Sequence, residues 1–197
     1  MGVRGAKAAW ICARQYKARS LTMIKAFGYK ETMIVVLDTE TNGLPLFSYP
    51  SPKSFDMWPR LVSIAWKRVS NEPTAGGEHH VVKPTDFQIP AKISAIHGIS
   101  QDEAMTVGLP ILEVLEKIRK ALTPKDDSEA TVVCCYNTPF DLGVLKAEAY
   151  RHKATKLLER IEKAQWHCLM RHTTAVLKNG KTYRLQDALL QVGGPDA

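Results

Sequence analysis

The chain has 197 residues and a formal net charge of +7, and 45% of its residues are hydrophobic. This composition is typical of a single globular domain and excludes a disordered or collagen-like chain. The sequence contains no apolar run of about 18 residues, so we expect no membrane span. Its four cysteines form no Cys-x-x-Cys pair, which favours reduced thiols and an intracellular location.

The positive charge is concentrated at the N-terminus. Residues 1–31 hold seven of the 27 Lys and Arg residues and a single acid, so the rest of the chain carries 20 basic and 19 acidic residues. Residues 1–22 contain no acid and resemble an organellar transit peptide in composition. The alternatives are a flexible basic tail, or residues that precede a true start at Met23 or Met33. We predict a basic extension over 1–31, with mitochondrial or plastid import as a hypothesis, and a folded domain over 32–197.

The first half of the folded region predicts three strands. Met33–Leu37 is a continuous apolar run rich in β-branched residues, which favours a strand buried on both faces. Leu44–Pro59 contains four prolines and predicts a long irregular segment. Leu61–Val69 and His79–Lys83 predict two further strands, and the turn Asn71–Gly77 between them indicates an antiparallel meander.

The second half alternates between helical and strand patterns. Apolar residues recur at helical spacing in several segments, and Thr131–Tyr136 is a second buried strand. A meander followed by strands that alternate with helices predicts an α/β fold, in which helices flank a mixed sheet. The predicted helices are Ala91–Ile99 (ending at Gly98), Pro110–Leu122, Phe140–His152, Thr155–Ala164, His167–Leu177 and Leu185–Val192.

Two acidic residues follow the first buried strand. Asp38 and Glu40 are separated by one residue, so in an extended chain they point to the same side. Two neighbouring carboxylates repel each other unless a cation lies between them, and magnesium is the usual occupant of such oxygen sites. A second triplet of this kind, Asp127 to Glu129, lies in a polar loop and is interpreted as a solvated charge cluster.

Two further residues, Asp141 and His97, are candidates for a functional site, and each also has an ordinary structural explanation. Asp141 lies where the strand Thr131–Tyr136 gives way to a helix, so it either caps that helix or adds a third carboxylate at the same sheet edge. His97 precedes Gly98, which fits either a surface helix end or a loop that approaches a nucleotide closely.

The order of three motifs is more specific than any one of them. DTETNGLP, then IHGIS, then NTPFD resembles the DEDD superfamily of 3′-to-5′ exonucleases, and most closely the His-type branch that contains the proofreading subunit of bacterial replicative polymerase. The resemblance extends from about Met33 to Val192. It implies a ribonuclease H-like fold and two-metal hydrolysis of phosphodiester bonds, with Mg²⁺ or Mn²⁺ as cofactor and the 3′ end of a single-stranded nucleic acid as partner. By position, it implies catalytic and metal-binding roles for Asp38, Glu40 and Asp141, and substrate-binding roles for Thr41, His97, Asn137 and Phe140.

The resemblance departs from the family at the third motif, which supplies a fourth carboxylate preceded by His or Tyr. Tyr183 and Asp187 have the Tyr-type spacing, but Asp187 follows Asp141 by only 46 residues. The sequence YRLQDALLQVGG instead resembles the helix before the third motif. We therefore interpret Tyr183 as a packing aromatic and Asp187 as a solvated residue, and expect a C-terminally incomplete domain. A non-catalytic nucleic-acid-binding or scaffold protein on the same fold is the alternative function.

The aromatic residues of the long irregular segment have two interpretations. They stack on a splayed base, as in proteins that bind single strands, or they cover an edge of the sheet. These residues are Phe47, Tyr49, Phe55 and Trp58.

Overall fold

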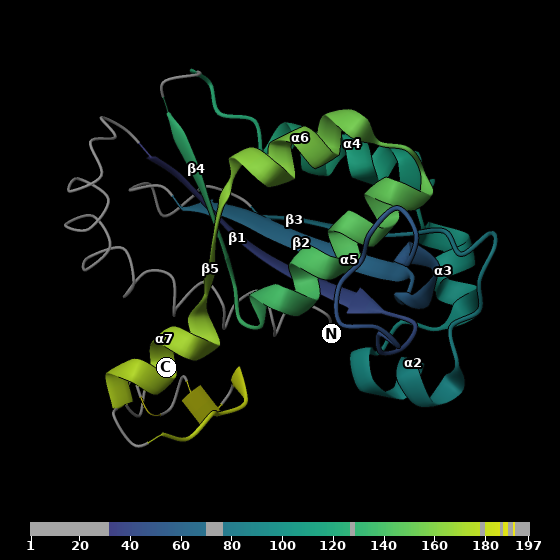
Figure 1. The fold of residues 1–197 in the computed structure, drawn as a ribbon. Helices are drawn as coiled ribbons and strands as arrows, with labels where there is room; N and C mark the ends of the chain where they lie inside the picture. The colour runs from purple at the N-terminus through teal and green to yellow at the C-terminus, as the bar shows by residue number, and fades with distance from the viewer. Residues whose placement is uncertain are drawn as a thin grey trace.

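The computed structural model describes residues 32–69, 77–126, 129–177, 180–185, 187, 188 and 191. The predicted extension over 1–31, all of the turn Asn71–Gly77 except Gly77, the start of the Asp127 triplet and much of the helix Leu185–Val192 therefore lie outside the described residues. The described strands form one five-stranded sheet in the order β3-β2-β1-β4-β5 (Figure 1).

Strand β1 (Thr32–Thr41) lies at the centre of this sheet. It pairs antiparallel with β2 (Leu61–Val69), which in turn pairs antiparallel with β3 (Gly77–Val81). On its other side β1 runs parallel to β4 (Ala130–Cys135), and β4 runs parallel to β5 (Gln165–Cys168). The predicted meander and mixed sheet are confirmed.

The two faces of β1 contact different parts of the core. Met33, Val35 and Leu37 belong to the large cluster beneath three helices, whereas Ile34 and Val36 face smaller clusters on the other side. A central strand buried on both faces explains the uninterrupted apolar run in its sequence. The three helices are α4 (Ile111–Ala121), α5 (Thr138–Arg151) and α6 (Thr155–Lys163), and α5 crosses in front of β1 and β2 in Figure 1.

Two elements differ from the sequence prediction. The helix predicted from His167 is wrong at its start, because Gln165–Cys168 pairs with β4 as a strand and α7 (Leu169–Leu177) begins afterwards. A strand of four residues is too short to show a periodicity, so its pairing with a neighbour decides its structure. Helix α3 (Gln101–Val107) was not predicted, although Ser100 and Glu103 have the Ser-x-x-Glu spacing of a helix start and the Ser100 side chain accepts a hydrogen bond from the Glu103 N–H.

The remaining segments agree with their predictions. Helix α2 (Ala91–His97) ends at Gly98, whose φ of 82° is a left-handed conformation that glycine adopts without strain. The irregular segment after β1 contains one short 3-10 helix, η1 (Phe55–Met57). Among the described residues, no helix has both the length and the apolar character needed to span a bilayer.

Candidate active site

The end of β1 extends past its parallel neighbour. Pairing with β4 reaches only Val36, opposite Cys134, whereas β1 continues to Thr41. Asp38 and Glu40 therefore lie within a strand that is still held by β2 but has no strand partner on the β4 side. The sequence predicted these acids after the strand, and their position inside it gives both side chains a fixed backbone.

Asp141 closes the open side of β1. It lies in the first turn of α5, and only 4% of its surface is exposed. Its Oδ1 accepts a hydrogen bond of 3.0 Å from the Thr39 backbone N–H and one of 2.8 Å from the Thr39 hydroxyl. The structure thus places the third predicted carboxylate beside the residue that separates the first two.

Burial raises the pKa of all three carboxylates, and the charge of Asp38 raises the pKa values of the other two further. Burial raises the pKa of Asp38 to about 6, and burial together with the charge of Asp38 raises the pKa of Glu40 to about 7. The pKa of Asp141 is raised well above its usual range by burial and by Asp38, although the Thr39 hydrogen bonds act in the opposite direction. Asp38 is therefore the carboxylate that interacts with both of the others, and a nearby cation would favour the ionised form of all three.

The donor chemistry of this set fits a hard divalent cation. All three side chains offer carboxylate oxygens, which Mg²⁺ and Mn²⁺ prefer over nitrogen or sulfur ligands. Within the described ranges, however, no three His, Cys, Asp or Glu side chains are gathered closely enough to form a complete ligand group. The structure therefore shows carboxylates that are electrostatically coupled through Asp38, and the metal site itself remains a proposal.

Thr41 and His97, the residues predicted to contact a nucleotide, are both buried. The Thr41 hydroxyl donates to the Gly43 carbonyl at 2.7 Å. His97 is the last residue of α2 but is only 9% exposed, so it lies at a helix end, as one interpretation had it, but is buried and not on the surface. Its Nδ1 accepts a hydrogen bond from the Ile99 N–H, and burial lowers the pKa of the ring. The neutral ring therefore carries its proton on Nε2, which has no hydrogen-bond partner among the described residues.

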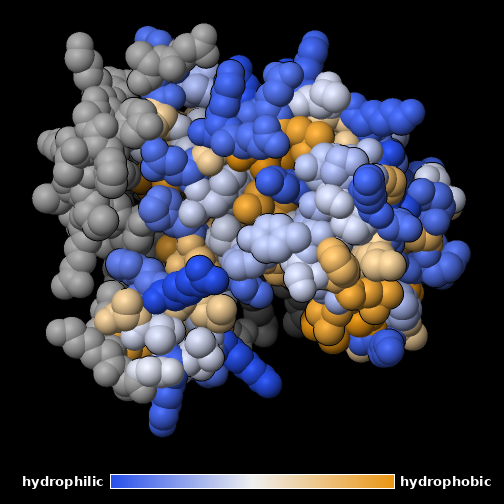
Figure 2. All heavy atoms as spheres, viewed as in Figure 1, coloured by the Kyte–Doolittle hydropathy of each residue, from blue (hydrophilic) through white to orange (hydrophobic). Residues whose placement is uncertain are grey.

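Asn137 and Phe140 line a cavity of about 390 Å³ beside the start of α5. The opposite wall comes from the segment after β1, where Leu46 is 85% exposed. Figure 2 shows an apolar patch on the surface of this region. The other lining residues are Pro45, Phe47, Ser48, Trp58 and Pro139.

The aromatic residues of this segment divide between the two interpretations. Trp58 is buried in the core, and Phe55 packs partly against it, so these two residues cover the sheet and helix edge. Phe47 and Tyr49 are 54% and 68% exposed, which leaves them free to contact a base. Only the latter pair therefore fits the stacking interpretation.

The residues with third-motif spacing have unremarkable surroundings. Asp187 is exposed, and Tyr183 is half-buried. The Tyr183 carbonyl accepts a hydrogen bond from the Tyr136 hydroxyl, which ties this segment to the end of β4. The exposure of Asp187 agrees with its interpretation as a solvated residue.

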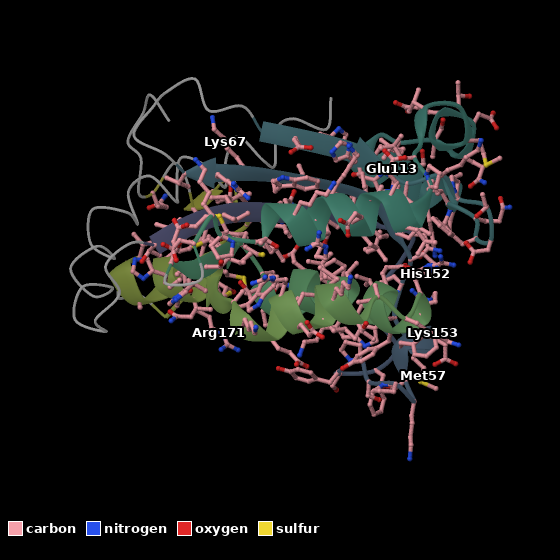
Figure 3. All side chains as sticks on the ribbon, turned by 90° about the horizontal axis from the view of Figure 1, so that it is seen from above. Met57, Lys67, Glu113, His152, Lys153 and Arg171 are labelled. Atoms are coloured by element: carbon pink, nitrogen blue, oxygen red, sulfur yellow. The ribbon has the colours of Figure 1, made fainter. Side chains whose placement is uncertain are left out.

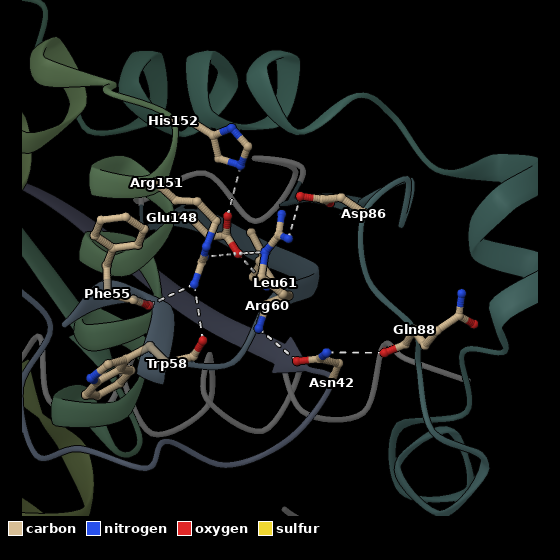
Figure 4. A network of polar contacts seen from close by, with 10 residues as sticks. All are labelled: Asn42, Phe55, Trp58, Arg60, Leu61, Asp86, Gln88, Glu148, Arg151 and His152. Atoms are coloured by element: carbon tan, nitrogen blue, oxygen red, sulfur yellow. Dashed lines mark hydrogen bonds and ion pairs between the residues drawn. The ribbon is translucent and has the colours of Figure 1, made fainter. Parts of the chain in front are cut away.

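A buried ionic network, not predicted from the sequence, connects α5 to the same end of the sheet (Figure 4). Glu148 is fully buried, and its Oε1 accepts hydrogen bonds from Arg60 Nε at 2.9 Å and from the Leu61 N–H at 3.0 Å. Burial alone would raise the pKa of Glu148, but His152, Arg151 and Arg60 lower it to about 2. Glu148 lies seven residues after Asp141, which is about two helical turns, so the two residues share one face of the helix. This spacing was the signal in the sequence that could have indicated a buried Glu148.

Further contacts extend this network at both ends. Arg60 Nη1 pairs with Asp86 at 2.7 Å, and the Arg60 N–H donates to Asn42 Oδ1 at 2.8 Å, directly beyond β1. At the C-terminal end of α5, Arg151 Nη2 donates to the carbonyls of Phe55 and Trp58. Figure 3 shows His152 and Met57 at this same end of the molecule, far from Arg171.

The family model for exonucleases, RNase_T, matches residues 35–196. The chain belongs to the exonuclease family. No curated protein matches the sequence. The sequence predicted a ribonuclease H-like fold. The structural likeness to exonuclease I confirms this prediction.

Three solved structures illustrate the likeness of this exonuclease-family chain to exonuclease I. The apo enzyme is 19% identical with a TM-score of 0.58, over 79% of this chain and 33% of that one. Escherichia coli exonuclease I in complex with a dT13 oligonucleotide is 19% identical with a TM-score of 0.58, over 78% and 32%. A structure of exonuclease I described as suggesting how processivity is achieved is 20% identical with a TM-score of 0.61, over 83% and 36%. The chain thus spans about a third of the length of these proteins.

Proposed function

We propose that this chain is a 3′-to-5′ exonuclease domain that hydrolyses phosphodiester bonds at the 3′ end of a single-stranded nucleic acid. The observation that carries the proposal is the meeting of β1 and α5, where Asp141 bonds to the residue between Asp38 and Glu40. Membership of the exonuclease family supports a nuclease activity. The polarity, the His-type branch and the likeness to a proofreading subunit rest on the motifs DTETNGLP, IHGIS and NTPFD.

The carboxylates would hold the divalent cations that the reaction requires. Asp38, Glu40 and Asp141 are the residues that would bind Mg²⁺ or Mn²⁺. When bound, a pair of such ions supplies Lewis-acid stabilisation of the attacking and leaving oxygens. The rigid strand β1 and the first turn of α5 hold these side chains in place before substrate arrives, which reduces the cost of ordering them.

The other residues of the site would bind the terminal nucleotide. The Ile99 N–H sets the tautomer of His97, and the buried Nε2–H has no partner among the described residues, so in the proposed complex it would donate a hydrogen bond to an acceptor atom of the sugar or phosphate. Phe140 and Asn137 line the neighbouring cavity, whose exposed apolar wall suits the face of a base. The complex of exonuclease I with dT13 supports single-stranded nucleic acid as the partner.

Two end-labelled strands test both activity and polarity. We expect the chain with Mn²⁺ to release the label of a 3′-labelled single strand as mononucleotide at once, and to shorten a 5′-labelled strand stepwise. Glu40→Gln should abolish both, whereas Glu113→Gln, on the exposed face of α4, should behave as the parent. Equal cleavage by Glu40→Gln would contradict the assignment. Binding of the strand without any cleavage by the parent would support the non-catalytic alternative.

A further inference from the structure

Thr39, the residue between Asp38 and Glu40, makes a contact that the three motifs do not explain. Thr39 is buried, and it lies on the face of β1 that also presents Leu37 to the helices, opposite to the face of Asp38 and Glu40. It contacts the third carboxylate through two separate donors, its backbone N–H and its hydroxyl.

The backbone contact follows from the geometry of the sheet. Because β4 stops pairing with β1 at Val36, the Thr39 N–H has no strand partner on that side. Asp141 occupies the place of the missing carbonyl and accepts this N–H at 3.0 Å. Any residue at position 39 except proline would supply this bond, so it carries no information about the side chain.

The hydroxyl contact depends on threonine. Oγ1 donates to the same oxygen, Oδ1, at 2.8 Å. A carboxylate oxygen has two lone pairs, and these two donors use both of them. The rotation of the Asp141 carboxyl group is thereby fixed, and Oδ2 is left as the oxygen that can bind another group.

We infer that Thr39 is a positioning residue, whose hydroxyl holds Asp141 through Oδ1 so that Oδ2 is the oxygen that would bind a divalent cation. This inference rests on the proposed function, because it assumes that the three carboxylates bind a cation. Partners that orient a ligating carboxylate commonly change metal affinity or activity by about 10- to 100-fold when they are removed. Thr39 would act through Asp141 without touching the substrate.

A set of threonine variants tests the inference without nucleic acid. Thr39→Val keeps the shape and the backbone N–H but removes the hydroxyl, whereas Thr39→Ser keeps the hydroxyl. Calorimetric titration with Mn²⁺ should give a dissociation constant about tenfold weaker for Thr39→Val and within about threefold of the parent for Thr39→Ser. Thr131→Val is the matched control, since Thr131 is also a buried strand threonine but donates to the Leu122 carbonyl. It should bind Mn²⁺ as the parent does.

The outcomes separate the two proposals. If the parent binds Mn²⁺ and Thr39→Val binds it equally, the positioning role is wrong and the proposed function stands. If Thr39→Ser is as weak as Thr39→Val, the hydroxyl is not responsible, and the inference fails. If the parent does not bind Mn²⁺, both proposals fail. Should Thr39→Val not fold, as judged by circular dichroism, Thr39→Ala replaces it, because the smaller side chain introduces no clash.

Activity gives a second readout. At low Mn²⁺ concentration Thr39→Val should cleave a 3′-labelled strand more slowly than the parent, and saturating Mn²⁺ should restore much of the rate. The KM for the strand should stay unchanged, because Thr39 does not contact nucleic acid in this account. A raised KM with unchanged metal dependence would overturn the inference.

Discussion

Arg60, directly before β2, and Glu148, on α5, form a buried ion pair in which Nε lies 2.9 Å from Oε1. The two residues are 88 positions apart in the chain, and each is connected to a different part of the candidate site. Arg60 holds Asn42 beyond the end of β1, and Glu148 lies on the same helix as Asp141. The pair therefore fixes the helix that carries one carboxylate against the strand end that carries the other two.

Removal of the buried carboxylate should destabilise the fold strongly. Glu148→Gln removes the carboxylate that pairs with Arg151 and one of the two that pair with Arg60, and breaking a buried pair in this way typically costs about 3–5 kcal/mol. Urea denaturation should show this loss. Glu116→Gln, which breaks an exposed pair with Arg119 on α4, is the control and should change the unfolding midpoint little. Equal stability of the Glu148 variant and the parent would contradict the role of the network.

The same residue predicts a pH dependence of stability. The pKa of Glu148 is lowered from 4.5 to about 2 in the folded chain, so the unfolded state binds its proton at a higher pH than the folded state does. The contribution of Glu148 to stability is complete above pH 4.5 and is lost as the pH falls from about 4.5 to about 2. The difference in unfolding free energy between the parent and Glu148→Gln should therefore shrink over that range. A difference that stays constant would be incompatible with the lowered pKa.

Gly143 marks a close approach between α5 and the irregular segment. A Cβ atom at this position would lie 2.1 Å from the ring of Trp58. Gly143→Ala should therefore force the indole or the helix to move, at a cost of about 1–3 kcal/mol. Gly43→Ala, where a Cβ would meet nothing within 4 Å, is the matched control for thermal denaturation. Melting of both variants at the temperature of the parent would contradict the close approach of Gly143 to Trp58.

The exposed aromatic residues after β1 should contribute to binding of a single strand. Phe47 is 54% exposed and lines the cavity beside Phe140. Loss of one base–aromatic contact costs about 1–3 kcal/mol, so Phe47→Ala should weaken the binding of labelled oligo-dT about tenfold or more. Fluorescence anisotropy with an inactive Glu40→Gln background prevents cleavage during the measurement. Leu112→Ala, at an exposed apolar position on α4, should have no effect, and an equal effect of the two substitutions would argue against stacking.

The sequence predicted the parts of the fold that have strong local signals. β1 and β2 are apolar over their central lengths, and α2 ends at a glycine with positive φ, so pattern and turn chemistry were sufficient. β5 escaped prediction because four residues carry no period, and its structure depends on pairing with β4. The missed α3 is a different case, because Ser100 and Glu103 carried a readable start signal.

The candidate site was predicted residue by residue but not in its arrangement. The motifs led to Asp38, Glu40 and Asp141 as candidates, since the order of the motifs along the chain is specific. They did not indicate that Thr39 would bond to Asp141, because that contact depends on β4 ending its pairing before β1 does. Nor did they indicate Glu148, whose partner Arg60 is remote in the chain and adjacent only in the folded protein.

Direct titration with a divalent cation tests the central claim that the side chains of Asp38, Glu40 and Asp141 form one metal site. Calorimetry should detect Mg²⁺ binding to the parent chain. Binding should be lost in Asp38→Asn, because Asp38 is the carboxylate that interacts with both of the others. Asp102→Asn, on the exposed first turn of α3, should bind Mg²⁺ as the parent does. If Asp38→Asn binds Mg²⁺ with the affinity of the parent, the assignment of these carboxylates as metal ligands is wrong.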